Sequence, residues 1–184
     1  MIAPRFPKPY ADFVARLRVP SGFVLVAAFA WFSHPDARSL ARGLPVAAAG
    51  LLLRGWAAGH LAKNQRLATG GPYAYTRNPL YIGTLLVAAG LVIASRSVGL
   101  GVLFAAVLLL VYLPVIQLEE QHLRSLFPEY ADYAARVPAL WPRRLGSHSP
   151  QAFAWSLYLK NREYQAAAGF VAGIAFLLWK ALRH

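Results

Sequence analysis

The apolar residues of this chain are gathered into five long tracts. Four tracts carry no charged side chain, and they cover residues 19–35, 78–95, 97–118 and 164–179. The fifth, residues 44–62, is interrupted by a single charge, that of Arg54. A helix of about 16 to 22 residues is roughly 24–33 Å long, and the hydrocarbon core of a bilayer is about 30 Å thick. The pattern therefore predicts an all-α, polytopic integral membrane protein with about five transmembrane helices.

The polar residues between the tracts set the expected boundaries. We expect spans at residues 19–33, 44–60, 79–95, 97–118 and 164–180. The Pro-rich tail 1–18 is expected to be extended or interfacial, and residues 79–118 to form a helical hairpin around a turn of three residues, 95–97. Leu and aromatic residues at helical spacing predict an interfacial amphipathic helix over 119–136, and Pro114 should kink the fourth span.

Composition agrees with a membrane protein and leaves room for one domain. The chain has 184 residues, of which 58% are hydrophobic and 14% are charged, whereas a soluble domain carries about 25% charged residues. The spans leave little chain for a separate soluble domain, so residues 1–184 are expected to form a single unit. There is no Cys, which excludes a disulfide framework, a thiolate metal site and a cysteine nucleophile. We assign no metal site.

Basic residues are distributed unevenly between the two sides of the predicted membrane domain. Residues 1–18, 61–78 and 119–163 together carry 13 Lys and Arg, and the segments on the opposite side carry 5. The positive-inside bias therefore predicts a cytoplasmic N-terminus and a non-cytoplasmic C-terminus. The net charge is +12, but the basic residues that produce it flank the spans and do not form one continuous stripe. We therefore expect no nucleic-acid partner.

The loop ahead of the third span is the first candidate site. A Gly-Gly-Pro run at 70–72 forces a turn, and Asn78 before Pro79 is a good helix start. Backbone N–H groups and the Arg77 side chain should converge there at the membrane surface, where they would suit an anionic group. The competing interpretation is a membrane-entry turn with interfacial tyrosines.

Two adjacent acids, Glu119 and Glu120, lie where the hairpin returns to the same side. Both carboxylates should face the loop that contains Arg77. Two adjacent negative charges need a cationic partner, which is either a ligand or an arginine of the chain. Arg54 lies in the middle of the second span, where a cation is expensive. It would bind a substrate carboxylate or phosphate, or else pair with a helix carbonyl.

The two motifs together resemble the isoprenylcysteine carboxyl methyltransferase superfamily, which also includes phospholipid N-methyltransferases. The resemblance rests on GPYAYTRNPLYIG at 71–83, EEQHLRSLF at 119–127 and YADYAARVP at 130–138, and it extends over about residues 50–142. The resemblance implies a membrane-embedded enzyme that uses S-adenosylmethionine. The cofactor pocket would then be formed by the hairpin and its flanking segments, residues 61–142.

The resemblance also implies residue roles. Residues 65–68 and Tyr73 would surround the adenosyl part, Asn78 to Tyr81 would complete the pocket, and Glu119 would hold the amino acid ammonium. His60 matches a polar cofactor contact ahead of the loop. The cofactor-binding residues implied in this way are His60, Gln65, Arg66, Leu67, Ala68, Tyr73, Asn78, Pro79, Leu80, Tyr81 and Glu119.

Two positions depart from the family pattern. Asn78 stands where the family usually has His, and Asn forms hydrogen bonds but does not titrate. Val115 stands where the eukaryotic prenylcysteine enzymes carry a basic residue for the substrate carboxylate. The span at 164–180 also follows the Glu motif, where many relatives end.

Together these observations predict a membrane methyltransferase with a lipophilic or lipidated acceptor, which reaches a cytoplasm-facing site from the surrounding lipid. Arg77 and Glu120 are expected to act in catalysis, with Glu120 as the base that an amine acceptor needs. Arg54 is the expected acceptor-binding residue. A sterol-reductase-like oxidoreductase using NADPH and a non-catalytic membrane scaffold remain the alternatives. The sequence identifies neither the acceptor nor the oligomeric state.

Overall fold

The computed structural model describes residues 6–141 and 151–183, and every regular element within these ranges is helical. The elements in chain order are α1 (Lys8–Phe32), α2 (Ala37–Ala58), the 3₁₀ turn η1 (Gly71–Ala74), α3 (Pro79–Ser95), α4 (Val98–Val107), the π-helical turn η2 (Leu108–Tyr112), α5 (Leu113–Leu126), α6 (Tyr130–Arg136), α7 (Trp155–Lys160) and α8 (Tyr164–Ala181).

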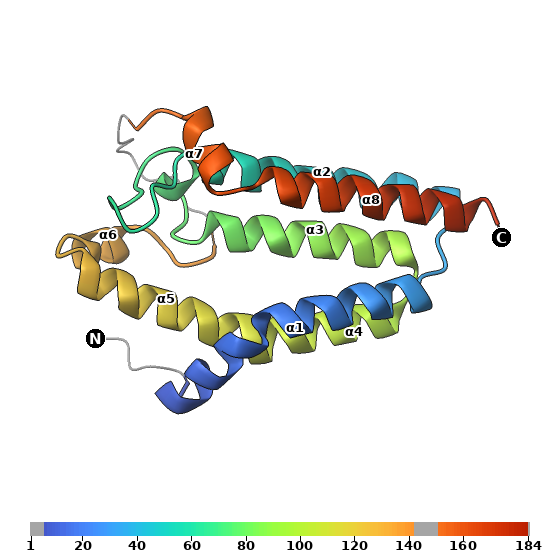
Figure 1. The fold of residues 1–184 in the computed structure, drawn as a ribbon, viewed down its shortest axis with the longest axis horizontal. Coiled ribbons are helices and arrows are strands. Elements are labelled where there is room, and N and C mark those ends of the chain that lie inside the picture. Colours follow the sequence, from blue (N-terminus) through green and yellow to red (C-terminus); the bar gives the residue numbers. More distant parts are fainter. Residues whose placement is uncertain (1–5, 142–150, 184) are drawn as a thin grey trace.

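The long helices lie side by side along the long axis of the molecule (Figure 1). α2 packs along α3 and touches α8, while α1 packs against α4, η2 and α5. The loop between α2 and α3, together with α6 and α7, gathers at one end, and the C-terminus lies at the other end (Figure 1). The helices therefore form an elongated bundle whose polar loops are concentrated at one end.

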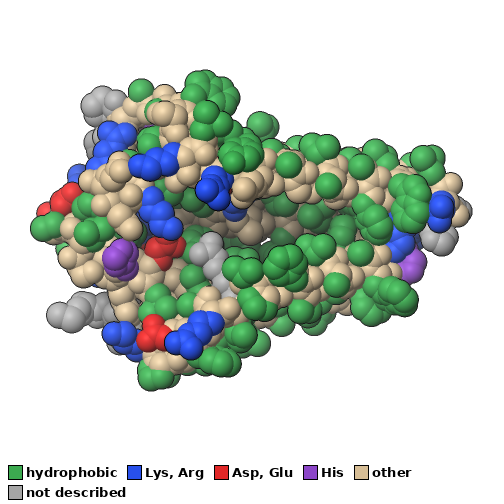
Figure 2. All heavy atoms as spheres, in the orientation of Figure 1, with side chains coloured by type: hydrophobic (Ala, Val, Ile, Leu, Met, Phe, Trp, Pro, Cys, Tyr) green, Lys and Arg blue, Asp and Glu red, His purple; other side chains and the backbone are tan. Residues whose placement is uncertain are grey.

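The chain is a membrane protein, but the five predicted spans are not confirmed. The continuous helix Val98–Leu126 and α8 are long and apolar enough to cross a bilayer, and α1 is a third candidate if its two bent halves count as one span. α3 is apolar but has 17 residues. α2 has the length, but it carries three arginines. Large apolar side chains such as Phe23, Trp31 and Val98 are exposed along the bundle, where lipid would cover them (Figure 2).

The tail predicted over residues 1–18 is not extended in its second half. α1 begins at Lys8, with Pro9 in its first turn, a position where a missing N–H costs nothing. The helix bends by 50° between Lys8–Leu17 and Val19–Phe32. Pro20 accounts for the bend, because its ring removes one helical hydrogen bond and crowds the preceding turn.

The predicted helix over 119–136 is also corrected, because it is divided in two. Its first part continues α5 to Leu126, and its second part is the separate helix α6. Pro128 disfavours helical geometry at Phe127, which is extended at φ −123° and ψ 109°. The interruption lets α6 turn back toward the loop between α2 and α3.

The disturbance expected at Pro114 takes the form of the π-helical turn η2 just ahead of it. Pro114 has no N–H for the carbonyl of Leu110, four residues earlier. The hydroxyl of Tyr10 on α1 donates a hydrogen bond to that carbonyl at 2.8 Å. The irregular turn is therefore tied to the neighbouring helix.

Glycines bring α2 and α3 into close contact. A Cβ added at Gly50 would lie 2.6 Å from the Gly83 carbonyl oxygen, and one added at Gly43 would lie 2.6 Å from the Ala94 nitrogen. Small residues allow such backbone contact between membrane helices. The approach brings Arg54 of α2 against the first turns of α3. The predicted tight turn is confirmed at the far end, where Arg96 is left-handed at φ 55° and Ser97 caps α4.

Candidate functional site

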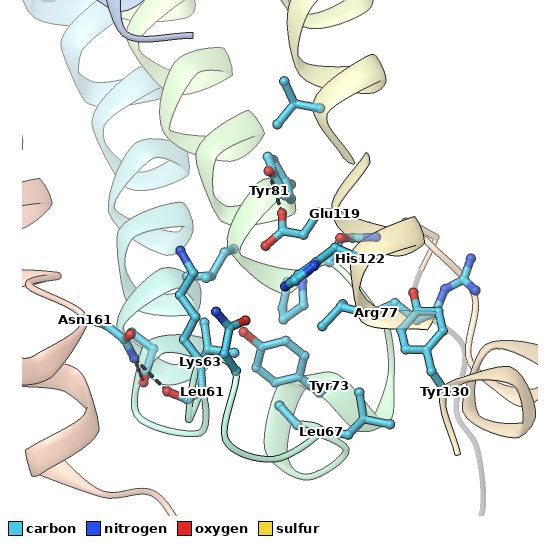
Figure 3. A pocket seen from close by; sticks show the side chains of 18 of the residues that line it. Leu61, Lys63, Leu67, Tyr73, Arg77, Tyr81, Glu119, His122, Tyr130 and Asn161 are labelled. Carbon is cyan, nitrogen blue, oxygen red and sulfur yellow. Dashed lines mark hydrogen bonds between the residues drawn. The ribbon is translucent and has the colours of Figure 1, made fainter. Parts of the chain in front are cut away.

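A cavity of about 760 Å³ lies at the end of the bundle where the loops gather (Figure 3). Its walls come from α2, α3, α5, α6, the α2–α3 loop and the turn between α7 and α8. Acidic and basic side chains surround the same region of the surface (Figure 2). Eleven of the residues predicted from the sequence line it: Arg54, Arg66, Leu67, Ala68, Tyr73, Arg77, Asn78, Pro79, Leu80, Tyr81 and Glu119. Three others, His60, Gln65 and Glu120, are not part of the lining.

His60 packs against the α2–α3 loop at Gly71 and does not line the cavity. Its side chain is 4% exposed, and its Nδ1 lies 2.9 Å from the Trp56 carbonyl oxygen. Gly71 has a left-handed φ of 55°, and a Cβ there would lie 2.5 Å from the His60 Nε2. Glycine is therefore required at 71 both by the backbone conformation and by the imidazole beneath it.

Tyr73 directs its hydroxyl into the cavity (Figure 3). The side chain is 6% exposed, and the hydroxyl has no hydrogen-bond partner among the described residues. Burial raises the pKa of Tyr73 well above its ordinary value, because the phenolate would lose its hydration. The hydroxyl therefore stays protonated and is available to a ligand as donor and acceptor.

Arg77 and Glu120 form an ion pair with 3.0 Å between Nη2 and Oε1. The backbone N–H of Arg77 donates to the Pro138 carbonyl at 2.9 Å. The expected meeting of the loop with the acidic pair is thus present, and for Glu120 the partner is an arginine of the chain. The Arg77 Nε is buried and has no partner among the described residues.

Asn78 starts α3 without the predicted side-chain cap. Its amide nitrogen instead donates to the Ala139 carbonyl at 3.1 Å, which connects the loop to the segment after α6. Pro79 occupies the first turn of α3, as expected. The side chain of residue 78 therefore orients a neighbouring segment instead of satisfying the helix end.

Glu119 points into the cavity and accepts a hydrogen bond from the Tyr81 hydroxyl at 2.8 Å (Figure 3). No cation forms an ion pair with it in the described part of the chain. Lys63 and Arg66, in the loop that lines the same cavity, also lack an ion pair within residues 6–141 and 151–183. The cavity therefore offers one unpaired acid and two unpaired bases.

Arg54 has a partner that the sequence analysis missed. Glu163 accepts from the Arg54 Nε and, at 3.0 Å, from its Nη2. Arg54 also donates to the Thr84 hydroxyl of α3. The Glu163 side chain is 8% exposed. Arg54 lies in the second predicted span, where a cation needs a counter-ion. Glu163 is the single acid of the sequence after Asp132, and this position could have pointed to the pair.

Other lining residues also carried no prediction. Lys63, Asn64, Thr84, Tyr112, His122 and Asn161 belong to this group. His122 lies beside Glu119 on α5, and Asn161 precedes α8 (Figure 3). No set of three or more metal-binding His, Asp or Glu side chains occurs in the described ranges.

A sequence model of the phospholipid methyltransferase family matches residues 48–130, which include the α2–α3 loop and most of the cavity-lining helices. No solved structure matches the chain significantly. The matched region ends before α7 and α8.

Two curated proteins are similar to the chain. The cobalt-zinc-cadmium resistance protein CzcN of Cupriavidus metallidurans is 40% identical over 103 residues, which cover 55% of this chain and 46% of CzcN. The nickel-cobalt-cadmium resistance protein NccN of Alcaligenes xylosoxydans xylosoxydans is 33% identical over 149 residues, which cover 74% of this chain and 70% of NccN. The chain thus aligns with just under half the length of CzcN and with most of NccN.

Proposed function

The chain belongs to the phospholipid methyltransferase family, and from this premise we propose that it transfers a methyl group from S-adenosylmethionine to a lipophilic acceptor in the membrane. The observation that carries the proposal is the cavity, which is lined by residues 66–68 and Tyr73 of the loop and by Glu119 of α5. Both predicted motifs contribute side chains to this single space.

The residues of the cavity fit the proposed cofactor. A zwitterionic amino acid group needs one anionic and one cationic partner, and Glu119 and the loop bases Lys63 and Arg66 provide them. The unpartnered Tyr73 hydroxyl and the apolar Leu67 and Ala68 suit an adenosyl group. These features support the proposed cofactor through charge and polarity.

S-adenosylmethionine supplies an electrophilic methyl group when it is bound. In the proposed mechanism Glu119 holds the ammonium, residues 66–68 and Tyr73 surround the adenosyl part, and Asn78 to Tyr81 complete the pocket. His60 contributes indirectly, because its imidazole packs against Gly71 of the loop. Positioning of this kind contributes up to about 7–11 kcal/mol to catalysis in favourable cases.

The acceptor is proposed to enter from the surrounding lipid. A small apolar recess lined by Leu85, Phe104 and Leu108 adjoins Tyr81 and Tyr112, which also line the large cavity. Arg54 is the proposed acceptor-binding residue, and Glu163 is its counter-ion in the structure. Arg77 lines the cavity, and Glu120 pairs with it from outside the lining. Both are the proposed catalytic residues, and Glu120 would take the proton that an amine acceptor loses. The site would face the cytoplasm.

Methyl transfer itself is the test of this proposal. Purified protein in neutral detergent is incubated with methyl-labelled S-adenosylmethionine and a whole lipid extract, and the labelled product is then identified. We expect label in a lipid fraction, and we expect it to be lost when S-adenosylhomocysteine is added as a competitor. Absence of labelled lipid, combined with binding of NADPH, would replace the proposal with a reductase function.

A further inference from the structure

The segment between residues 151 and 163 contacts the cavity loop although it lies outside the region that matches the family. The Gln151 Oε1 accepts hydrogen bonds from the backbone N–H groups of Thr69 and Gly70, both at 3.1 Å. The Gln151 Nε2 donates to the Leu67 carbonyl at 3.2 Å. One side chain therefore pairs with three main-chain groups of the loop.

These contacts matter because the loop has no regular structure between Leu61 and Gly70. Buried main-chain groups need partners, and no helix or sheet provides an acceptor for the N–H groups of Thr69 and Gly70. The side chains of Leu67 and Ala68, which are 8% and 5% exposed, form a wall of the cavity. The backbone that carries this wall is therefore held by Gln151.

Two further contacts attach the same segment to the start of the loop. The Ala154 N–H donates to the Gly59 carbonyl at 2.9 Å. The Asn161 amide nitrogen donates to the carbonyls of Ala58 and Leu61 at 2.9 and 2.8 Å, where α2 ends (Figure 3). The segment thus holds both the end of α2 and the cavity wall beyond it.

We propose that Gln151 is a positioning residue that fixes the loop at Leu67 and Ala68 for cofactor binding. The inference rests on the proposed function for the identity of the cofactor. The geometry of the loop does not depend on that identity. Gln151 acts through Leu67, Thr69 and Gly70, and it does not belong to the cavity lining.

The first test measures the loop without any ligand. Backbone amide hydrogen exchange is recorded by mass spectrometry for peptides covering residues 66–73 in the wild type and in Gln151→Leu. We expect faster exchange at Thr69 and Gly70 in the variant, because both N–H groups lose their acceptor. Gln165→Leu, at an exposed position in the first turn of α8, is the matched control and should leave this exchange unchanged.

The second test measures binding of S-adenosylhomocysteine by titration calorimetry. Gln151→Leu should weaken binding by about 5- to 30-fold, the factor expected for a loss of one to two kcal/mol. Gln151→Glu should bind with intermediate affinity, because a carboxylate accepts from both N–H groups but does not donate to Leu67. Unchanged loop exchange and unchanged affinity in Gln151→Leu would overturn the inference. A wild type that does not bind the probe would instead overturn the proposed cofactor, and the exchange result would still decide the role of Gln151.

Discussion

At the scale of single residues, two adjacent acids differ in their surroundings. Glu120 pairs with Arg77, whereas Glu119 accepts from Tyr81 and faces the cavity. Neighbouring positions on a helix point about 100° apart, so both carboxylates cannot occupy the same environment. Their different partners support separate roles for the two residues in the proposed mechanism.

The ion pair between Arg54 and Glu163 predicts a specific pattern of stability. Glu163→Gln should lower the Tm in detergent, because it leaves the Arg54 guanidinium without its anionic partner. The loss should be below the roughly 3–5 kcal/mol known for fully buried pairs, since the Arg54 side chain is 23% exposed. The double variant Arg54→Leu/Glu163→Leu should recover part of the Tm. Strictly additive losses from the two positions would argue against a coupled pair.

Tyr130 predicts how stability depends on alkaline pH. Burial raises the pKa of Tyr130 to about 12 from an ordinary value near 10.0, and the nearby carboxylate of Glu120 acts in the same direction. Between pH 10 and 12 the unfolded chain therefore binds fewer protons than the folded chain, so the contribution of this group to stability is lost as pH rises. The fall in Tm over this range should be shallower in Tyr130→Phe. Identical pH profiles would contradict the raised pKa.

The sequence predicted eleven of the cavity residues, because most of these lie in or just before the motif that leads into α3. It did not predict Glu163, which pairs with Arg54 of α2, or Gln151, which contacts the α2–α3 loop. Both lie more than 80 residues away from their partners in the sequence. A pairing over that distance leaves no local pattern in one sequence. The role of His60 as a support was also hidden, because it depends on the left-handed turn at Gly71.

At the scale of the elements, prolines and glycines determine where helices stop and how closely they pack. Pro128 ends α5, and Pro20 bends α1. Hydropathy alone located the apolar tracts, but it did not predict these interruptions or the early start of α1 at Lys8. Contact between α2 and α3 depends on Gly50 and Gly83, and it places Arg54 beside Thr84.

The contact between α2 and α3 predicts that Gly50→Ala destabilises the protein. Its new Cβ would lie 2.6 Å from main-chain atoms of α3, so the helices must separate. Overpacking of this kind costs about 1–3 kcal/mol. Gly169→Ala on α8 is the matched control, because nothing lies within 4 Å of its added Cβ. Equal Tm values for the two variants would refute the close-contact interpretation.

At the scale of the whole molecule, the bundle is consistent with the predicted division of charge. The α2–α3 loop, α6 and α7 share the end that contains the cavity, and the C-terminus lies at the opposite end (Figure 1). The bias of 13 basic residues to 5 predicts, under the positive-inside rule, that the cavity end faces the cytoplasm. Length and apolar composition support two of the spans, or three if the bent helix α1 counts as one.

Reporter fusions test the predicted orientation. A reporter fused after His184 should be active on the non-cytoplasmic side, and one inserted at Ser147 should be active in the cytoplasm, because the basic residues favour that orientation. Cytoplasmic activity from both fusions would mean that α8 does not cross the membrane, contrary to the five-span prediction.

Binding of S-adenosylhomocysteine to the wild type, Glu119→Gln and Glu120→Gln is the most direct test of the central claim. A charge-assisted hydrogen bond to the cofactor ammonium is worth about 1.5–3 kcal/mol, so affinity should fall roughly 10- to 150-fold in Glu119→Gln. It should fall less in Glu120→Gln, whose carboxylate pairs with Arg77. Tight binding by the wild type together with this order of losses is the predicted result. Failure of the wild type to bind, or equal affinities for all three proteins, would contradict the assignment of this cavity to S-adenosylmethionine.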